Sequence, residues 1–237
     1  MSTLLLRLAA PLQAWGTESK YITRATNREP SKSGVIGLLA AALGSKRDDD
    51  AALDNLRKLR FGVRVDREGE LLIDFQTVLG KFIKDDPNKL ENITTKRHYL
   101  ADAVFLAGLE SDDKAYLLEL SEALNDPVFP LFLGRRSCPP TLPLNLGIRD
   151  CGLEKALRDE PWQISDTAKK QWARWHEGSN PHLRIVYEPG PGEKPLAFLK
   201  DMPLTFNPLH RQYGYRGYTV IDDLEMPLPE HDPMSEL

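Results

Sequence analysis

The order of apolar segments along the first 140 residues constrains the fold of this chain most strongly. Runs that are apolar or alternate in polarity predict strands at residues 4–9, 61–65, 71–78 and 99–109. Apolar residues at helical spacing predict helices at residues 33–43, 51–59 and 111–124. Gly44 is expected to close the first helix as a C-cap, and Pro127 ends the last one. Strands and helices that alternate in this way predict an α+β domain.

Strand, helix, strand, strand, helix, strand is the order of the ferredoxin-like fold, which RNA-recognition motifs share. We therefore predict an α+β, ferredoxin-like (RRM-like) domain over residues 1–140, in which the turn at 66–69 makes 71–78 the partner strand of 61–65. Residues 80 to about 97 have mixed charge and no apolar period, and we interpret them as an inserted thumb hairpin. An irregular C-terminal extension with short strands, 141–226, is expected to pack on this domain. An acidic, disordered tail, 227–237, is expected to follow.

The charge of the chain is uneven, and this limits the kind of nucleic-acid binding that is expected. The chain has 237 residues and a formal net charge of −4. Residues 221–237 contain six acidic residues and no Lys or Arg, and the remaining chain has 31 basic and 29 acidic residues. A charge this close to neutral argues against nonspecific coating of nucleic acid. A local basic groove is still compatible with it.

Several classes of protein are disfavoured by what the sequence lacks. No apolar stretch has the length of a membrane span, so no membrane partner is expected. Cys138 and Cys151 are the two cysteines, which implies neither a disulfide framework nor a zinc site. No acidic cluster has the spacing of a two-metal nuclease. We expect a cytoplasmic protein without metal or cofactor.

The segment between the first strand and the first helix contains the first group of candidate binding residues. Pro-Leu-Gln-Ala-Trp-Gly at 11–16 follows the strand, and Pro-Ser-Lys-Ser-Gly at 30–34 opens the helix. A helix N-terminus presents unpaired N–H groups and partial positive charge, so it suits a phosphate. The candidates are Gln13, Trp15, Gly16, Arg24, Ser31, Lys32 and Ser33.

A purely structural interpretation of the same segment is also open. Ser31 or Ser33 could simply cap the helix while Lys32 is solvated, and Trp15 could belong to the core. The segment is not a Walker A motif, because the glycine spacing before a Lys-Ser pair is absent. Nucleotide hydrolysis is therefore not supported.

The loop Gly-Arg-Arg-Ser-Cys-Pro at 134–139 contains the second group of candidates. Arg135 and Arg136 cannot both be buried cheaply, so we expect one to be paired internally and the other to be free for a phosphate or a base. The alternative is that both are solvated or structurally paired. Ser137 and Cys138 complete this group of candidates.

A basic segment at 96–98 leaves two functions open. Lys96 and Arg97 are candidate RNA contacts. The neighbouring His98 also permits a metal-independent endoribonuclease, with His98 as acid or base and a cation steadying the phosphate. Trp162, Trp172 and Trp175 are interpreted as core or partner-protein contacts rather than as a base-stacking platform.

Five blocks of the sequence, in this order, resemble blocks of the CasD family, a small subunit of the type I-E CRISPR surveillance complex (Cascade). They are residues 11–16 with 30–39, 61–66 with 74–80, 97–105, 133–139, and 203–206 with Arg211 and Arg216. The resemblance covers roughly residues 4–220. Chance would not keep five blocks in order, so the set is specific although each block alone is weak.

The resemblance implies a function and a set of partners. It implies a non-catalytic subunit that binds the 5′ handle of the guide RNA (crRNA), caps the backbone filament, and contacts both the backbone subunit and the large subunit that inspects target DNA. By this resemblance the RNA-binding residues are Gln13, Trp15, Gly16, Arg24, Ser31, Lys32, Ser33, Lys96, Arg97, Arg135, Arg136, Ser137 and Cys138. The rivals are an endoribonuclease that processes repeat RNA, as in a related CRISPR subtype, and a scaffold that contacts only protein.

Overall fold

The computed structural model describes residues 1–16, 22–80, 91–176 and 179–228. The strands are β1 Ser2–Ala9, β2 Leu12–Gln13, β3 Thr23–Arg24, β4 Arg60–Arg67, β5 Glu70–Gly80, β6 Glu91–Ala101, β7 Val104–Ser111, β8 Asn145–Arg149, β9 His182–Tyr187, β10 Ala197–Thr205 and β11 Gln212–Glu225. The helices are α1 Lys32–Ala42, α2 Asp50–Arg57, α3 Lys114–Asn125, α4 Leu153–Asp159 and α5 Asp166–Trp175. The chain is a mixed α+β protein dominated by antiparallel sheet, as the sequence predicts at this level.

A seven-stranded sheet in the order β10-β11-β9-β4-β7-β1-β8 forms the body of the molecule. All its neighbouring strands are antiparallel. The C-terminal strands join this sheet at both edges, because β8 pairs with β1 and β9 pairs with β4. Residues far apart in the sequence are thereby held in one layer.

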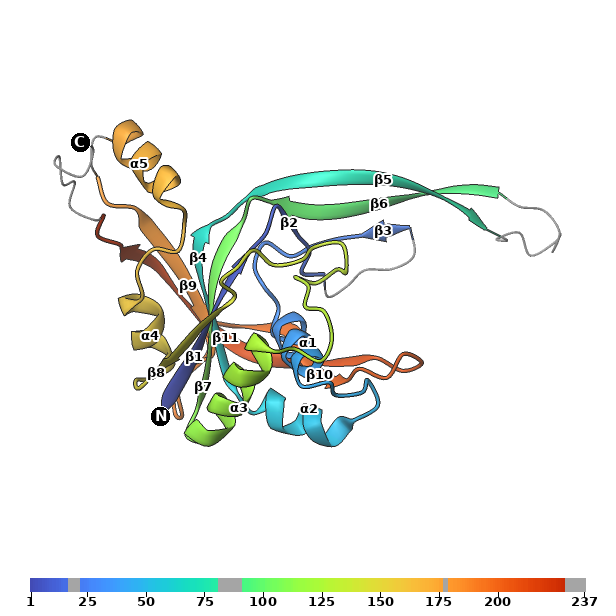
Figure 1. Cartoon of the computed structure of the whole chain (residues 1–237), viewed down its shortest axis with the longest axis horizontal. Coiled ribbons are helices and arrows are strands. Elements are labelled where there is room, and N and C mark those ends of the chain that lie inside the picture. The colour runs from blue at the N-terminus through green and yellow to red at the C-terminus, as the bar shows by residue number, and fades with distance from the viewer. Residues whose placement is uncertain (17–21, 81–90, 177–178, 229–237) are drawn as a thin grey trace.

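Alternating side chains of β1 face two separate cores. Leu4, Leu6 and Leu8 pack with α1, α2 and α3 on one face of the sheet. Leu5 and Ala9 pack with α4 and its following segment on the other face. Because successive strand residues point to opposite faces, an unbroken apolar strand such as β1 requires cover on both sides. Figure 1 shows α1–α3 on one side of the sheet and α4 and α5 on the other.

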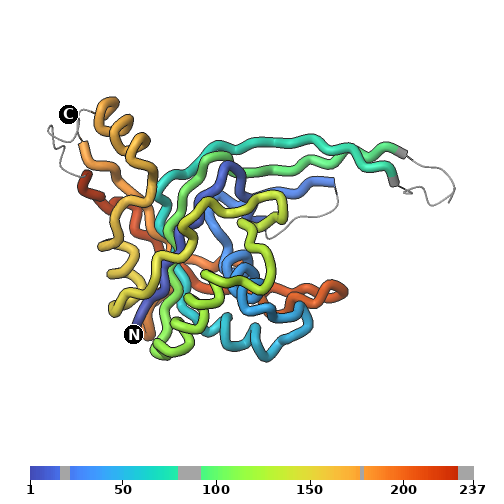
Figure 2. The backbone as a smooth tube through the Cα atoms, viewed as in Figure 1, coloured from blue at the N-terminus to red at the C-terminus, as the bar shows by residue number. Residues whose placement is uncertain are grey.

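A long hairpin of β5 and β6 projects from the body (Figures 1 and 2). Its strands pair from Glu70↔Ala101 to Gly80↔Glu91, so the hairpin is longer than the thumb predicted at 80–97. Its tip, residues 81–90, lies outside the described residues. Two short segments line its base, since β2 and β3 both pair with β6.

Two strand predictions in this region were wrong. The segment at 71–78 was expected to pair with 61–65, but β5 pairs with β6, while β4 pairs with β7 and β9. The single strand expected at 99–109 is two strands in two sheets. The extended conformation is interrupted at Asp102, whose φ of 56° lies in the left-handed region that Asp tolerates better than most residues.

The ends of α1 follow from its local sequence. Ser31 is the N-cap, and its hydroxyl accepts a hydrogen bond from the Gly34 amide at 3.2 Å. Gly44 follows the C-cap with φ +74°, and its amide donates to the Ala41 carbonyl, which confirms its expected role. The helix begins at Lys32, one residue before the predicted start.

The termini add little to this architecture. Of the acidic tail expected at 227–237, only residues 227 and 228 are described. Within the described ranges, no helix is both long enough and apolar enough to cross a bilayer.

Candidate nucleic-acid interface

Three segments, at residues 14–15, 26–27 and 133, meet beside the first turn of α1. The Ala14 amide donates to the Leu133 carbonyl at 3.2 Å. The Trp15 amide donates to the Thr26 hydroxyl at 2.8 Å, and the Asn27 amide donates to the Trp15 carbonyl at 3.3 Å. The fold therefore brings together two of the groups of candidates that the sequence singled out, at 13–16 and at 134–138.

The loop that carries Arg135 and Arg136 is closed on itself and held tightly against residue 14. The Leu133 amide donates to the Cys138 carbonyl at 2.8 Å, and the Cys138 amide donates to the Arg135 carbonyl at 2.9 Å. Gly134 has φ +83°, and a Cβ there would lie 1.6 Å from the Ala14 carbonyl oxygen. Only glycine allows this close approach of the two backbones.

A groove with a cavity volume of about 1060 Å³ opens where these segments meet α1. Its walls come from the three segments, from α1 and the loop after it, and from the β10–β11 hairpin. Six basic side chains line it: Arg24, Lys46, Arg47, Arg135, Arg136 and Arg211. Asp48 is the one acidic residue among the described residues that line it. We call this surface the basic groove; such a cleft concentrates positive potential.

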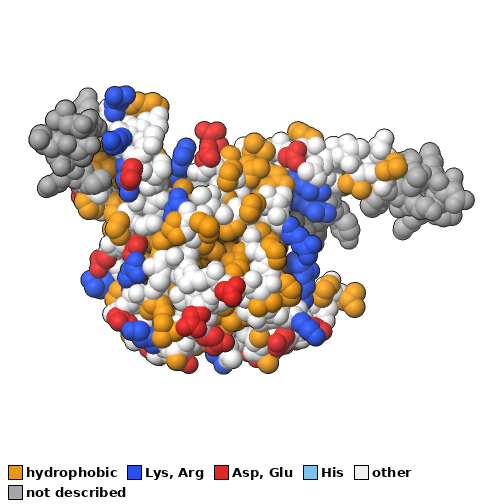
Figure 3. Space-filling model, viewed as in Figure 1, with side chains coloured by type: hydrophobic (Ala, Val, Ile, Leu, Met, Phe, Trp, Pro, Cys, Tyr) orange, Lys and Arg blue, Asp and Glu red, His pale blue; other side chains and the backbone are white. Residues whose placement is uncertain are grey.

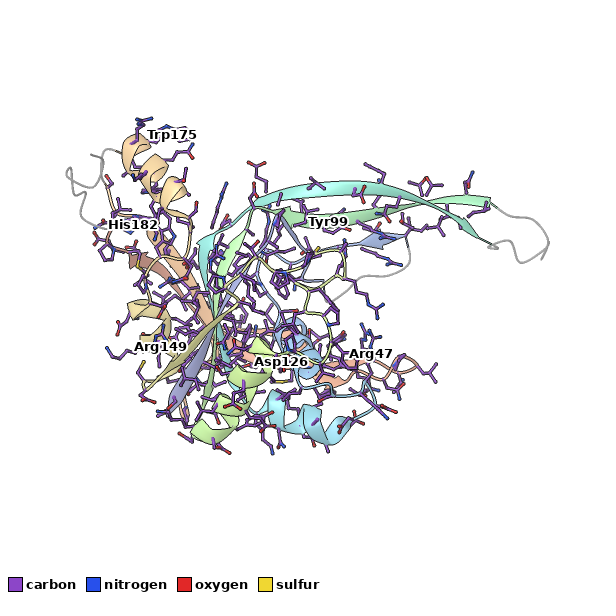
Figure 4. The ribbon with its side chains drawn as sticks, viewed as in Figure 1. Arg47, Tyr99, Asp126, Arg149, Trp175 and His182 are labelled. Atoms are coloured by element: carbon purple, nitrogen blue, oxygen red, sulfur yellow. The ribbon has the colours of Figure 1, made fainter. Side chains whose placement is uncertain are left out.

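The space-filling view agrees with this distribution. Figure 3 shows Lys and Arg side chains gathered in a band on the body, beneath the β5–β6 hairpin. Figure 4 places Arg47 on the same side, in the α1–α2 loop, with Tyr99 at the base of the hairpin above it. The basic groove therefore lies between the hairpin and the helical side of the body.

Arg135 and Arg136 have different surroundings, as the sequence predicts for adjacent arginines. Arg135 donates from Nη2 to the Arg24 carbonyl at 2.8 Å, and its guanidinium carbon lies 4.5 Å from the centre of the Tyr99 ring. Arg136 is exposed and lines the basic groove. Arg135 thus fixes the loop to the hairpin base, which leaves Arg136 in position to meet an anion.

Ser31 and Ser33 line the basic groove, but their hydroxyls also serve the helix. Both residues are buried, and the two hydroxyl oxygens are 3.3 Å apart. Gly16, which is exposed, and Arg24 line the same groove. The N-terminal turn of α1 is therefore one wall of the groove, although the Lys32 amide at its start already donates to Asp201.

Gln13 and Trp15 are buried, and of the two only Trp15 is among the described residues that line the groove. Trp15 is 1% exposed, and its indole nitrogen donates to Gln13 Oε1 at 3.1 Å. The Gln13 amide donates to the Leu8 and Ala103 carbonyls. Trp15 packs against Gly34, where a Cβ would lie 2.8 Å from its ring. The structure thus places Trp15 in the core, the alternative that the sequence left open.

Lys32 does not reach the groove, contrary to its placement among the candidates. It is 1% exposed, and its ammonium group donates to the Glu188 carboxylate at 2.8 Å. Its backbone amide donates to Asp201, which also binds Arg216 at 2.6 Å. Burial lowers the pKa of Lys32, and the nearby Glu188 opposes this. These buried ion pairs join the start of α1 to β10 and β11.

The remaining candidates are divided between the core and the hairpin. Cys138 is buried, and burial raises the pKa of its thiol, whereas Ser137 is exposed. Lys96 and Arg97 are adjacent on β6 and so point to opposite faces. Arg97 shares the face of Tyr99, the ring that Arg135 covers, while the Lys96 ammonium lies 5.7 Å from the Phe75 ring centre.

Sequence reasoning missed part of the groove. Lys46 and Arg47 lie in the α1–α2 loop, and Phe206, Arg211 and Tyr213 come from the β10–β11 hairpin. Lys46-Arg47 carries the same signal that singled out 135–136, namely adjacent basic residues in a loop. No local pattern could have assigned β10 and β11 to this place, because they reach it only through the sheet order.

Comparisons with known proteins agree with one another. The family model described as "CRISPR-associated protein (Cas_Cas5)" matches residues 3–218. The chain is 42% identical over 157 residues to "CRISPR system Cascade subunit CasD" of Escherichia coli (strain K12), a match that spans 59% of this chain and 68% of the relative.

Solved structures are similar over nearly the whole chain. One, a "CRISPR RNA-guided surveillance complex", contains a chain with a TM-score of 0.75 and 33% identity, covering 99% of this chain and 97% of that one. Another, "Crystal structure of Cas protein", has a TM-score of 0.70 and 34% identity, covering 97% and 100%. Because the family model matches most of its length, the chain belongs to the Cas5 family of CRISPR-associated proteins.

Proposed function

We propose that this chain is a non-catalytic subunit of a type I-E CRISPR surveillance complex, acting in the cytoplasm, which binds the 5′ handle of crRNA and caps the backbone filament. The basic groove is the observation that carries this proposal, because six cations line a cleft built from the predicted binding segments. The similarity to a Cascade subunit and to a surveillance complex supports the assignment to this assembly.

We propose that the core of the fold is ferredoxin-like (RRM-like), with the β5–β6 hairpin as an inserted thumb. The order β4-β7-β1-β8, with all pairs antiparallel, supports this, since α1 and α2 connect β1 to β4 and α3 connects β7 to β8. The thumb then lies between the second and third strands of the core. Residues 141–226 would be the extension packed on this core, to which they contribute β8.

In the proposed complex, single-stranded RNA lies along the basic groove. Arg136, Lys46 and Arg47 would contact phosphates, while Phe206 and Tyr213 offer rings on which unstacked bases can pack. Gly16 lines the groove and has no side chain, so it would let the RNA backbone approach closely. Ser137, Lys96 and Arg97 remain proposed contacts at the margins of the groove.

We propose that the thumb contacts the neighbouring backbone subunit. Its strand β5 exposes large apolar side chains, including Phe75 at 62% and Leu79 at 61%. Such side chains on a projecting hairpin are typical of an interaction surface. The family resemblance adds a contact with the large subunit, near which target DNA would be inspected.

Removing Arg136 is expected to weaken RNA binding without unfolding the protein. Arg136→Ala should lower the affinity for crRNA by roughly ten- to a hundredfold, since one charge-assisted hydrogen bond contributes roughly 1.5–3 kcal/mol. The slope of log affinity against log salt should become shallower by about 0.7, the value for one phosphate of a single strand that the protein no longer neutralises. Fluorescence anisotropy with labelled crRNA over a salt series measures both values.

Arg174 provides a matched control for this experiment. It is an exposed arginine on α5, on the other side of the sheet from the basic groove. Arg174→Ala should leave both the affinity and the salt slope unchanged. Equal losses in the two variants would show that net charge, not the groove, controls binding.

We also expect no ribonuclease activity, although the alternative of an endoribonuclease centred on His98 was open from the sequence. His98 and Arg97 are adjacent on β6 and point to opposite faces, so these two cannot converge on one phosphate. Lys96 shares the face of His98, but its ammonium group lies over the Phe75 ring, 5.7 Å from the ring centre. Excess protein should leave a labelled repeat hairpin RNA intact at neutral pH with chelator. A single-site cut that is present in the wild type and absent in His98→Ala would establish the nuclease instead.

A further inference from the structure

Strand β5 is a free edge of the hairpin sheet. Within the described residues it pairs only with β6, over a ladder of 11 residues that has no register shift. The short strand β3 pairs with the other side of β6, so β5 forms the outer margin of the hairpin (Figure 1). A strand edge presents a row of backbone N–H and C=O groups without partners, and such a row can receive another strand.

The ladder fixes which backbone groups lie on this edge. The Lys96 amide donates to the Ile22 carbonyl at 2.8 Å, so Lys96 turns its backbone groups away from β5. Phe75 is opposite Lys96, and in an antiparallel pair it therefore turns its own N–H and C=O away from β6. The Gln76 carbonyl, one residue on, faces β6 and accepts from the Thr95 hydroxyl at 3.1 Å. By this alternation the outward row consists of Leu71, Ile73, Phe75, Thr77 and Leu79.

The two edge strands of the seven-stranded sheet are protected against pairing, whereas β5 is not. Strand β10 contains Lys200 and Pro203, and its ladder with β11 shifts register twice. Strand β8 has five residues, a register shift in its ladder with β1, and Gly147 in the left-handed region. Charged side chains, proline, bulges and shortness are the features that keep a strand edge from pairing. Strand β5 is long and regular and contains no proline, lysine or arginine, so its edge is open to a further strand.

The side chains of β5 indicate the chemistry of the strand that fits there. Four apolar side chains of the outward row share one face and are 46% to 62% exposed, namely Leu71, Ile73, Phe75 and Leu79. The charged residues of the strand are Glu70 and Asp74, both acidic. Lys96 brings one cation to the face of Phe75, with its ammonium group 5.7 Å from the ring centre, but it comes from β6, on the side away from the free edge.

These features favour a polypeptide strand over the other occupants of such an edge. A phosphate backbone offers acceptors but no row of N–H donors for the outward carbonyls, and the two carboxylates of β5 repel it. A second copy of β5 would bring carboxylates together without any cation of its own, which disfavours self-pairing. A strand of another protein with alternating apolar residues and a Lys or Arg meets both the hydrogen-bonding row and the charge.

We propose that the free edge of β5 receives an extended strand of the neighbouring subunit, which continues the hairpin sheet by main-chain hydrogen bonds. The added strand exchanges N–H···O=C bonds with the outward row, and its apolar side chains pack beside Phe75 and Leu79. Its cations lie near Glu70 and Asp74. This inference rests on the proposed contact between the thumb and the backbone subunit, and it specifies how that contact is made.

Hydrogen exchange resolved to single amides tests the main-chain pairing. It is measured on the full chain alone and on the complex assembled with the backbone subunit and crRNA. The amides of Ile73, Phe75 and Thr77 should exchange fast in the chain alone and about a hundredfold more slowly in the complex, because each gains an acceptor. If they stay fast in the assembled complex, the contact is made by side chains alone and the inference is overturned. Protection that grows with the concentration of the isolated chain identifies a second copy as the occupant and also overturns it.

Two matched proline variants locate the pairing on the edge of β5. Thr77 and Thr94 are opposite each other in the ladder, and each turns its amide away from the other strand. Thr77→Pro removes a donor from the free edge and Thr94→Pro removes one from the opposite edge, while the β5–β6 hydrogen bonds remain. Protection of the Gln76 amide in both variants checks that the ladder has formed.

Thr77→Pro should weaken incorporation into the complex about tenfold, because one carbonyl of the added strand loses its donor. Thr94→Pro should leave incorporation unchanged. Equal effects of the two variants overturn the inference. Failure of the proposed function looks different: the wild-type chain does not assemble with the backbone subunit and crRNA at all, and the inference then falls with it.

Discussion

Gly134→Ala is expected to lower the free energy of unfolding by about 2–5 kcal/mol and to abolish crRNA binding. The left-handed conformation at φ +83° disfavours any side chain, by roughly 1–2 kcal/mol. The new Cβ would also lie 1.6 Å from the Ala14 carbonyl oxygen, so the two backbones must separate. That separation breaks the hydrogen bond between Ala14 and Leu133 and displaces Arg135 and Arg136 from the groove.

Gly192→Ala separates the two causes. Gly192 has nearly the same φ, +87°, but nothing lies within 4 Å of the position that a Cβ would take. Its replacement should cost only the roughly 1–2 kcal/mol of the conformation itself and should leave RNA binding intact. Urea denaturation and crRNA anisotropy on both variants make the comparison. If the two variants lose equal stability, the close approach at Gly134 does not constrain the loop.

Asp201→Ala is expected to have the second large effect, a loss of about 3–5 kcal/mol in the free energy of unfolding. Asp201 is 3% exposed and binds both the Arg216 guanidinium and the Lys32 amide. Without it, Glu188 is the carboxylate left near two buried cations. An unpaired buried charge is far more costly than the loss of a surface ion pair.

Because of its position in the fold, replacing Asp201 should affect RNA binding as well as stability. Asp201 on β10 joins the N-terminus of α1 to β11, and these elements form facing walls of the basic groove. Weaker crRNA binding should therefore accompany the loss, even where the variant is still folded at low temperature. Asp150→Ala, which removes an exposed partner of Lys114 at 2.6 Å, should change stability only slightly. A comparable loss in the two variants would contradict this account of the buried network.

The sequence predicted those features that depend on short-range chemistry. Patterns within a few residues predicted the strand at 4–9, the helices at 33–43 and 111–124, and the turn at Gly44; the structure has these elements at 2–9, 32–42 and 114–125. Of the two candidate caps, Ser31 and Ser33, Ser31 is the N-cap. The unequal surroundings of Arg135 and Arg136 also followed from a local argument, since two adjacent arginines cannot both be buried at low cost. The motifs at 13–16 and 134–138, which the sequence singled out, both contain residues that line the groove.

Pairing between distant strands could not be predicted in the same way. Strand β5 is as apolar as a core strand, so its alternation did not show that it pairs with β6 in a projecting hairpin. The turn at Asp102 depends on a single residue in the left-handed region. Nothing in the local sequence indicated that Lys32 is buried, because a lysine after a helix cap is usually solvated.

The amino-acid sequence alone therefore determined most element types in residues 1–140, the helix caps and the chemical character of the binding segments, because these depend on interactions among near neighbours. It did not predict the helices α4 and α5 or the long strands β10 and β11, where an irregular extension with short strands was expected. The tertiary structure alone decided which segments form one surface. Asp201, Glu188 and Arg216 lie more than 150 residues after Lys32, and only the sheet order β10-β11-β9-β4 brings them to the start of α1. Bringing such distant residues together costs chain entropy, and the favourable packing of the whole sheet offsets that cost.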